Sequence, residues 1–123
     1  LCVGEEAAGQ ATEAAAFVYR QIEAAVDSDW SLAARLVVAY EPVWAIGAAE
    51  PAGAGYVSGL AEELRGRLAD HGLEDLPVIY GGSAKPGLLP VLDRIDGLFL
   101  GRFAHDPANF GKVLDEALDL SPE

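Results

Sequence analysis

The sequence predicts an α/β fold in which parallel strands alternate with helices, and two patterns carry this prediction. Four short apolar segments show no alternation of polar and apolar residues, which is typical of strands buried on both faces of a parallel sheet. Between them, apolar residues recur every third or fourth position, which is the spacing of one buried helix face. A chain of 123 residues has the size of one small domain, so we expect a single domain over 1–123.

The expected strands are short, and small residues follow most of them. The strands cover 1–3, 36–40, 77–80 and 98–100. Three have glycine within two residues of the carboxyl end, namely Gly4, the pair Gly81-Gly82, and Gly101, and the other runs into Glu41. Because the carboxyl ends of parallel strands meet on one face, these residues predict a functional site there. The pattern alone fits an open four-stranded sheet and half of a closed barrel equally well.

Helices are expected between and after these strands. The buried stripes comprise Val18, Ile22 and Val26, then Leu60, Leu64 and Leu68, and finally Phe110, Val113, Leu114, Ala117 and Leu118. Asp106-Pro107 is typical of a helix start, with an N-cap and then proline at the first helical position. His71-Gly72 is expected to end the second helix, and 85–92 to form a short helix.

Composition and charge exclude several classes of function. The net charge is −12, with acidic residues scattered along the chain, which speaks against nucleic acid and anionic membranes as partners. Cys2 is the one cysteine, so no internal disulfide is expected, and we expect it to be a packed strand residue. Two histidines without a cysteine cluster speak against a metal site. Together these features favour a cytoplasmic globular protein.

Glu41 ends an apolar strand and is followed by a stiff hinge. Partial burial at such a position makes a carboxylate a better base near neutral pH. Pro42, Val43 and Trp44 can stiffen and anchor the exit from the strand, and the segment 45–49 is small enough to move as a lid. The alternative is an ordinary strand-end glutamate that pairs with a surface arginine. The hinge and the small tip favour a base beneath a movable loop.

A glycine-rich segment, Tyr80 to Ala84, lies between an expected strand and an expected helix. Successive glycines let backbone amides approach an anion, and Ser83 adds a hydroxyl donor, so phosphate is the natural ligand. The alternative is a tight turn with a serine N-cap. Gly101 offers a second amide after the next strand, and two such adjacent loops match the phosphate site typical of (β/α)8 barrels.

Four motifs in order resemble the carboxyl-terminal half of the triosephosphate isomerase family. They are Leu1-Cys2-Val3-Gly4-Glu5, the block from Ala39 to Gly47, the loop from Tyr80 to Ser83, and the strand from Asp96 to Gly101. The resemblance covers nearly the whole chain. It implies the four C-terminal units of a (β/α)8 barrel, with the N-terminal half absent. It also implies interconversion of dihydroxyacetone phosphate and glyceraldehyde 3-phosphate through an enediolate, without a cofactor or a metal.

The resemblance also implies a role for each matching residue. Glu41 would be the base, the Gly47 amide, Ser83 and the Gly101 amide would hold the substrate phosphate, Pro42, Val43 and Trp44 would form the lid hinge, and Glu5 would be structural support. The partner would be a small phosphorylated sugar, and the full-length parent would be a homodimer.

Two departures from the family pattern concern the lid and the phosphate loops. Gly47 is followed by Ala48-Ala49-Glu50-Pro51-Ala52, where the family has Gly-Thr-Gly-Lys-Thr-Ala, and Arg102 replaces the second glycine of a Gly-Gly pair. Arg102 either clamps phosphate or faces solvent and pairs with Asp106. These changes fit a branch that resembles the erythrulose phosphate isomerases.

The family's catalytic histidine and its Asn-Lys pair belong to the amino-terminal half, and neither His71 nor His105 matches them. The chain alone is therefore expected to be inactive. A non-catalytic half barrel that binds phosphate or self-associates is a further alternative, because unclosed strands leave bare edges.

Overall fold

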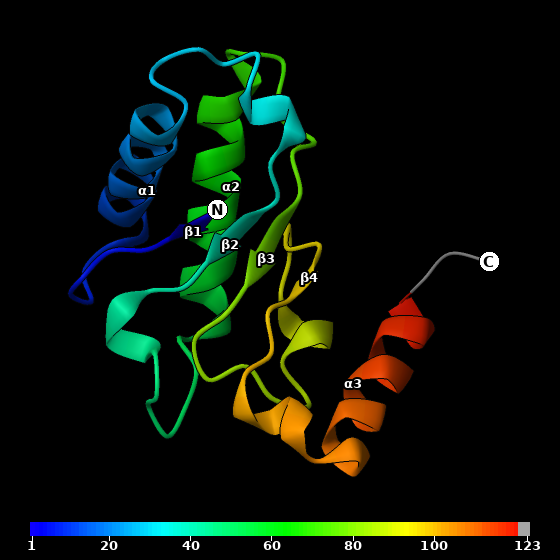
Figure 1. Ribbon diagram of the computed structural model, residues 1–123. Coiled ribbons are helices and arrows are strands. Elements are labelled where there is room, and N and C mark those ends of the chain that lie inside the picture. Colours follow the sequence, from blue (N-terminus) through cyan, green and yellow to red (C-terminus); the bar gives the residue numbers. More distant parts are fainter. Residues whose placement is uncertain (121–123) are drawn as a thin grey trace.

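The computed structural model describes residues 1–120, which form one parallel sheet with helices along it (Figure 1). The sheet has four strands in the order β1-β2-β3-β4, and each neighbouring pair is parallel. They are β1 Cys2–Val3, β2 Val38–Tyr40, β3 Val78–Tyr80 and β4 Gly97–Leu98. Helix α1 (Ala11–Ala25) follows β1, α2 (Ala54–Ala69) follows β2, and α3 (Pro107–Leu120) follows β4. The predicted α/β fold is confirmed, and the arrangement is consistent with part of a (β/α) barrel.

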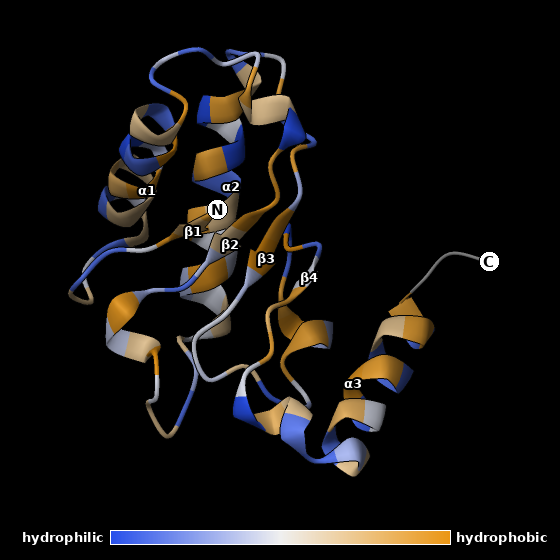
Figure 2. Ribbon diagram, in the orientation of Figure 1, coloured by the Kyte–Doolittle hydropathy of each residue, from blue (hydrophilic) through white to orange (hydrophobic). Residues whose placement is uncertain are grey.

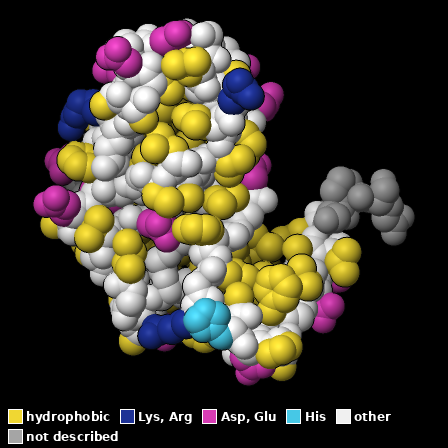
Figure 3. All heavy atoms as spheres, viewed as in Figure 1, with side chains coloured by type: hydrophobic (Ala, Val, Ile, Leu, Met, Phe, Trp, Pro, Cys, Tyr) yellow, Lys and Arg dark blue, Asp and Glu magenta, His cyan; other side chains and the backbone are white. Residues whose placement is uncertain are grey.

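The two faces of the sheet differ, because successive strand residues point to opposite sides. Val3, Tyr40 and Tyr80 lie in register and belong to the buried core, together with Val38 and Val78. The alternate row comprises Cys2, Ala39, Ile79 and Gly97. Figure 3 shows hydrophobic side chains gathered on the face of the molecule in front of the sheet.

Helices α1 and α2 pack against each other and against the buried face of the sheet. Val18 and Ile22 of α1 are fully buried, as are Leu60, Leu64 and Leu68 of α2, so the predicted stripes on both helices form the core. Figure 2 shows hydrophobic stretches on α2, which lies behind the strands. Val26, the third member of the first stripe, is buried just after α1 ends.

The expected helix boundaries are largely confirmed. Asp106 accepts a hydrogen bond from the Ala108 amide at 2.9 Å, so it caps α3, which begins at Pro107. After α2, Gly72 has a φ of +70°, and the Leu73 amide bonds the Leu68 carbonyl at 3.0 Å. This αL glycine with a 6→1 bond is a Schellman ending, which explains why the helix stops before Gly72.

Three expected segments differ from the structure by two or more residues at an end. The second strand begins at Val38 and not at residue 36, because Ala33–Arg35 form a 3-10 helix whose last bond is donated by the Leu36 amide. The last strand is Gly97–Leu98 and not 98–100, since only this short stretch pairs with β3. Within 85–92, only Leu89–Val91 are helical, as a 3-10 turn with a proline near its start.

Helix α3 departs from the predicted burial as well. Only Val113 is buried in it, whereas Phe110, Leu114 and Leu118 of the predicted stripe are exposed. The helix is tied to the loop after β3 by a hydrogen bond from the Gly87 amide to Glu116 Oε1. No helix within residues 1–120 is long and apolar enough to cross a membrane.

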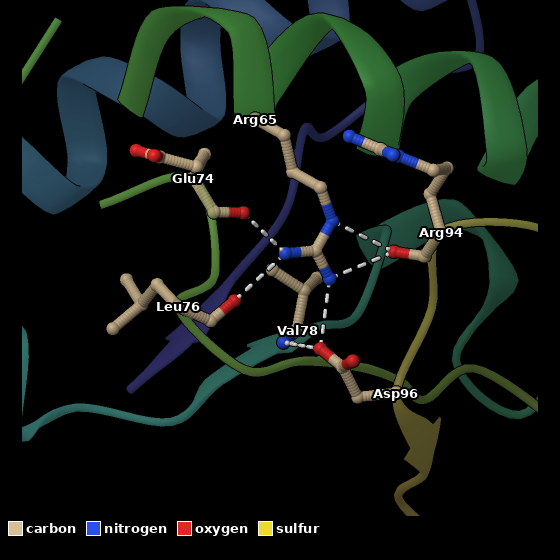
Figure 4. Close-up of polar contacts among 6 residues, drawn as sticks. All are labelled: Arg65, Glu74, Leu76, Val78, Arg94 and Asp96. Atoms are coloured by element: carbon tan, nitrogen blue, oxygen red, sulfur yellow. Dashed lines mark hydrogen bonds and ion pairs between the residues drawn. The ribbon is translucent and has the colours of Figure 1, made fainter. Parts of the chain in front are cut away.

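A buried arginine joins α2 to the starts of β3 and β4 (Figure 4). The Arg65 side chain, 7 % exposed, donates hydrogen bonds to the carbonyls of Glu74, Leu76 and Arg94 and to Asp96 Oδ2. The same Asp96 oxygen accepts the Val78 amide at 2.8 Å. Because the guanidinium has five donors in a fixed fork, one side chain satisfies several buried acceptors and fixes the ends of two strands.

We predict that Arg65→Met lowers the free energy of unfolding by about 3 kcal/mol, because it leaves buried carbonyls without donors. Denaturant unfolding of the purified protein measures this change. The matched control is Arg20→Met on α1, where Arg20 is exposed and its loss should cost less than about 0.5 kcal/mol. Equal stability of the two variants would contradict the role assigned to Arg65.

Candidate functional site

A pocket of about 260 Å³ lies at the carboxyl ends of the strands. Its walls come from the end of β2, the segment that follows it, and the loops after β3 and β4. The structure brings together here every residue for which base or phosphate contact was expected, namely Glu41, Gly47, Ser83, Gly101 and Arg102. Ile46, Gly82, Ala84, Phe99 and Phe103 complete the lining. A carboxylate thus faces glycine-rich backbone and one guanidinium in a single concavity.

Glu41 is held at the end of β2 by both neighbouring strands. The Glu41 amide donates a hydrogen bond to the Val3 carbonyl at 2.7 Å. The amide of Gly81, the residue directly after β3, donates to the Tyr40 carbonyl at 2.8 Å. A Cβ on Gly81 would lie 2.6 Å from Glu41 Cγ, and a Cβ on Gly4 would lie 2.0 Å from the Glu41 carbonyl oxygen. Only glycine fits at these two positions, so the strand-end glycines make the space that the glutamate occupies.

Cys2 lies next to Glu41 on the open face of the sheet. It was expected to be a packed strand residue, which is wrong, because its side chain is exposed. Partial desolvation raises the pKa of the Cys2 thiol, and its hydrogen bond to the Glu41 carboxylate raises that pKa further. The thiol therefore stays protonated at neutral pH and contacts the carboxylate as a neutral group.

The segment after Glu41, for which a lid hinge was expected, packs against α2. Val43–Ala45 make one 3-10 turn, and the Val43 amide donates to the Glu5 carbonyl at 2.9 Å. Trp44 packs edge-on against Tyr56 of α2, with ring centroids 5.7 Å apart. Within residues 1–120, the buried Trp44 Nε1 has no hydrogen-bond partner. The hinge is thus anchored by packing and one backbone bond, and it retains one unsatisfied donor.

Glu5 is a buried carboxylate, 6 % exposed, that joins three parts of the fold. Tyr40 of β2 donates its hydroxyl to Glu5 at 2.9 Å, and Tyr56 of α2 donates its hydroxyl to Glu5 Oε2. Burial, then the bond to Glu5, raises the pKa of Tyr56 to about 12, so this phenol stays protonated as a donor. Sequence reasoning missed Tyr56, which stands on the first turn of a helix without any motif around it.

Ser83 lies in the pocket wall, but its hydroxyl is engaged with the segment after β2. Ser83 Oγ lies 3.0 Å from the Ala45 carbonyl and 2.6 Å from the Ala48 carbonyl. A hydroxyl carries one proton, so it donates to one of these oxygens at a time. In this conformation the Ser83 hydroxyl therefore holds residues 45–48 at the pocket wall.

Arg102 lines the pocket and bonds the segment after β2, and no bond joins it to Asp106 among the described residues. Its Nη2 donates to the Ala48 carbonyl at 3.1 Å, and its guanidinium lies 5.8 Å from the Phe103 ring centroid. The Asp106 side chain instead caps α3. Because one guanidinium carries five donors, the bond to Ala48 leaves others available at the edge of the pocket.

Two further contacts to the segment after β2 were missed by sequence reasoning. Tyr80 accepts the Ala52 amide and donates to the Gly82 carbonyl, both at 2.9 Å. Lys85 Nζ lies 2.6 Å from Glu50 Oε2. The sequence gives only a weak indication of the pair between Lys85 and Glu50: the two opposite charges stand in loops that follow neighbouring strands.

Neither histidine lies in this pocket. His71 stacks on Trp30 with ring centroids 4.0 Å apart, and its Nε2 lies 2.8 Å from the Tyr19 hydroxyl. His105 is exposed in the 3-10 turn that precedes α3. In the part of the chain that the structure describes, no three His, Cys, Asp or Glu side chains are grouped so as to hold a metal ion. The charged side chains in the lining of this pocket are those of Glu41 and Arg102.

Comparison with known proteins agrees with this arrangement. The chain is 48% identical over 127 residues to an L-erythrulose-1-phosphate isomerase of Pectobacterium atrosepticum, covering 100% of this chain and 49% of that protein. It is 36% identical over 124 residues to triosephosphate isomerase 2 of Listeria innocua, covering 93% and 48%. It is also 36% identical over 126 residues to a triosephosphate isomerase of Alkalilimnicola ehrlichii, covering 95% and 50%.

The chain spans about half the length of these relatives. The sequence model of the triosephosphate isomerase family matches residues 1–117, which is nearly the whole chain. With the parallel β/α architecture and the pocket at the strand ends, this match shows that the chain belongs to the triosephosphate isomerase family.

Proposed function

We propose that the protein carrying this chain is an aldose–ketose isomerase in which Glu41 moves a proton between adjacent carbons of a phosphorylated sugar. One observation carries the proposal: Glu41 shares a single pocket with two glycine-bearing loops and a guanidinium. A carboxylate can accept a proton from a carbon next to a carbonyl and return it to the neighbouring carbon, which passes through an enediolate. The rigid seat of Glu41 between Gly4 and Gly81 supports this role, since a base must be held in place.

The phosphate half of the substrate would lie at the opposite side of the pocket from Glu41. The amides of Gly47 and Gly101 and the side chains of Ser83 and Arg102 are the proposed ligands. Gly47 and Ser83 have φ values of +73° and +57°, conformations that turn the backbone toward concavities suited to anions. While the Ser83 hydroxyl bonds the Ala45 and Ala48 carbonyls, Ser83 would bind phosphate through its backbone amide. Once those bonds are released, the hydroxyl would bind phosphate as well.

Residues 45–52, which we call the lid, would exclude water from the reacting carbons. The lid connects the hinge of Pro42, Val43 and Trp44 to α2, and in this structure it is bonded to the loops after β3 and β4. Removing water strengthens the electrostatic interactions inside the pocket and protects a reactive intermediate. Glu5 would support the hinge through the Val43 amide and Tyr56 without touching the substrate.

Two substrates are candidates. Dihydroxyacetone phosphate and glyceraldehyde 3-phosphate are the first candidate pair, supported by the similarity to several triosephosphate isomerases. A tetrulose phosphate is favoured by a separate observation, the 48% identity to an L-erythrulose-1-phosphate isomerase, together with the changed lid tip and Arg102.

A competition assay with the full gene product, meaning the protein expressed from its complete coding sequence, decides between these substrates. The triose and tetrulose phosphates are supplied together, and the ratio of the two kcat/KM values is measured. A tenfold or larger ratio in favour of either sugar assigns the substrate, whereas turnover of neither would contradict the proposed function.

We further propose that residues 1–123 correspond to the carboxyl-terminal half of one barrel domain in a cytoplasmic homodimer. The order of the four motifs and the coverage of about half of each relative support this placement. A non-catalytic half barrel that binds phosphate or self-associates is the competing proposal, supported by the exposed apolar side chains of α3.

Glu41→Gln in the full gene product should lower kcat by about 10³-fold, because the amide cannot accept the proton, with KM changed less than about threefold. Steady-state isomerisation of the preferred sugar phosphate measures both constants. The matched control is Glu62→Gln on the exposed face of α2, which should leave both unchanged. A Glu41→Gln enzyme with wild-type kcat would remove Glu41 from the base role.

The 123-residue chain expressed alone should show no isomerisation, since neither of its histidines lines the pocket to polarise the substrate carbonyl. The measurement is turnover of glyceraldehyde 3-phosphate by the purified chain. Detectable turnover that disappears in Glu41→Gln would contradict this expectation and would place the complete catalytic machinery within this chain.

A further inference from the structure

The lid tip carries an ion pair that the proposed chemistry does not use. Lys85, in the loop after β3, places its Nζ 2.6 Å from Glu50 Oε2 on the lid. Neither residue lines the pocket with Glu41, so neither is placed to contact a substrate bound there. Because the pair joins the loop after β3 to the lid, its effect on the proposed site is on the position of the lid.

The charges of this chain make the pair unusual. The chain has 8 basic and 20 acidic residues, and only two of the basic residues are lysines. One lysine and one arginine nevertheless both bond the lid, Lys85 at Glu50 and Arg102 at the Ala48 carbonyl. In a chain of net charge −12, the loops after β3 and β4 thus place two of the few basic side chains against the lid, whose one acidic residue is Glu50.

We propose that Lys85 and Glu50 are positioning residues that form an electrostatic latch, holding the lid closed over the pocket. This inference rests on the proposed function, because it assigns a cause to the closure that the reaction needs. The latch has a second point in Arg102, which bonds the Ala48 carbonyl at 3.1 Å, and the Ser83 hydroxyl bonds the same oxygen. Lid closure then depends on charge, in addition to the neutral bonds made by Tyr80 and Ser83.

The expected strength of the latch follows from its exposure. The Lys85 side chain is 31 % exposed and that of Glu50 is 76 % exposed, so solvent screens their attraction. Pairs of this kind change an equilibrium by up to about fivefold. The neutral bonds made by Tyr80 and Ser83 already hold the lid near this loop, so less conformational freedom is lost when the pair forms. The latch therefore shifts the population of the closed lid without being required for folding.

A charge-swap experiment on the full gene product tests the latch. The variants are Lys85→Glu, Glu50→Lys and the double swap, which restores the pair with its charges exchanged. The matched controls are Lys112→Glu on α3 and Glu62→Lys on α2, two exposed positions that receive the same changes in charge. Two quantities are measured at low salt and at about 0.5 M salt, where exposed pairs are screened. They are KM and kcat, and the rate of amide hydrogen exchange in peptides that span the lid.

At low salt, each single swap should raise KM by about fivefold and speed lid exchange by a similar factor, with kcat nearly unchanged. The double swap should return both quantities to within about twofold of wild type, and high salt should remove the differences. Additive effects in the double swap, or effects equal to those of the controls, would overturn the latch.

The two readouts separate the latch from the proposed function. If the wild-type protein isomerises neither sugar phosphate, the proposed function fails, and lid exchange in the unliganded variants still decides the latch. If the wild-type protein is active and single swaps alter neither exchange nor KM, the latch is wrong and the function stands. Exchange that accelerates in both single swaps and recovers in the double swap supports the latch in either case.

Discussion

The site depends on one steric constraint, the close approach of Glu41 to the backbones of the two neighbouring strands. A side chain at Gly4 would collide with the Glu41 carbonyl, and one at Gly81 would collide with the Glu41 side chain itself. The glutamate therefore sits where three parallel strands end, with its backbone bonded to β1 and its side chain against β3. The lid and the glycine loops, which we propose contact the substrate, are placed relative to this position of Glu41.

The rest of the fold keeps these strand ends aligned. Arg65 satisfies carbonyls that precede β3 and β4 and bonds Asp96, so it fixes the opposite ends of the strands whose carboxyl ends form the pocket. Glu5 performs a comparable task at the pocket end, where it joins Tyr40 to Tyr56. The two buried charged groups thus lie at opposite ends of the sheet, and each is satisfied by several hydrogen bonds, as burial of a charge requires.

Much of this could be predicted from the sequence, because the signals are local. Unbroken apolar segments, helical stripes and strand-end glycines predict the parallel sheet, the buried faces of α1 and α2, and a site with Glu41, Ser83 and Gly101 at the strand ends. Gly47 and Arg102, which also line the pocket, were expected there from the family resemblance. What failed depends on contacts between distant residues. The Tyr56 bond to Glu5, the lid contacts of Ser83 and Arg102, and the Lys85 pair join positions 35 to 54 residues apart that carry no shared motif. The stripe on α3 predicts burial, but the described residues leave most of it exposed.

Anion binding at the glycine loops, across the pocket from Glu41, is the property on which the proposed site depends, and titration with inorganic phosphate followed by amide NMR measures it. We expect saturable shifts concentrated at Gly47, Gly82, Ser83 and Gly101, with smaller changes along the lid. Saturable shifts elsewhere, such as at the larger pocket of about 440 Å³ around the start of α1, with these four amides unmoved, would contradict it.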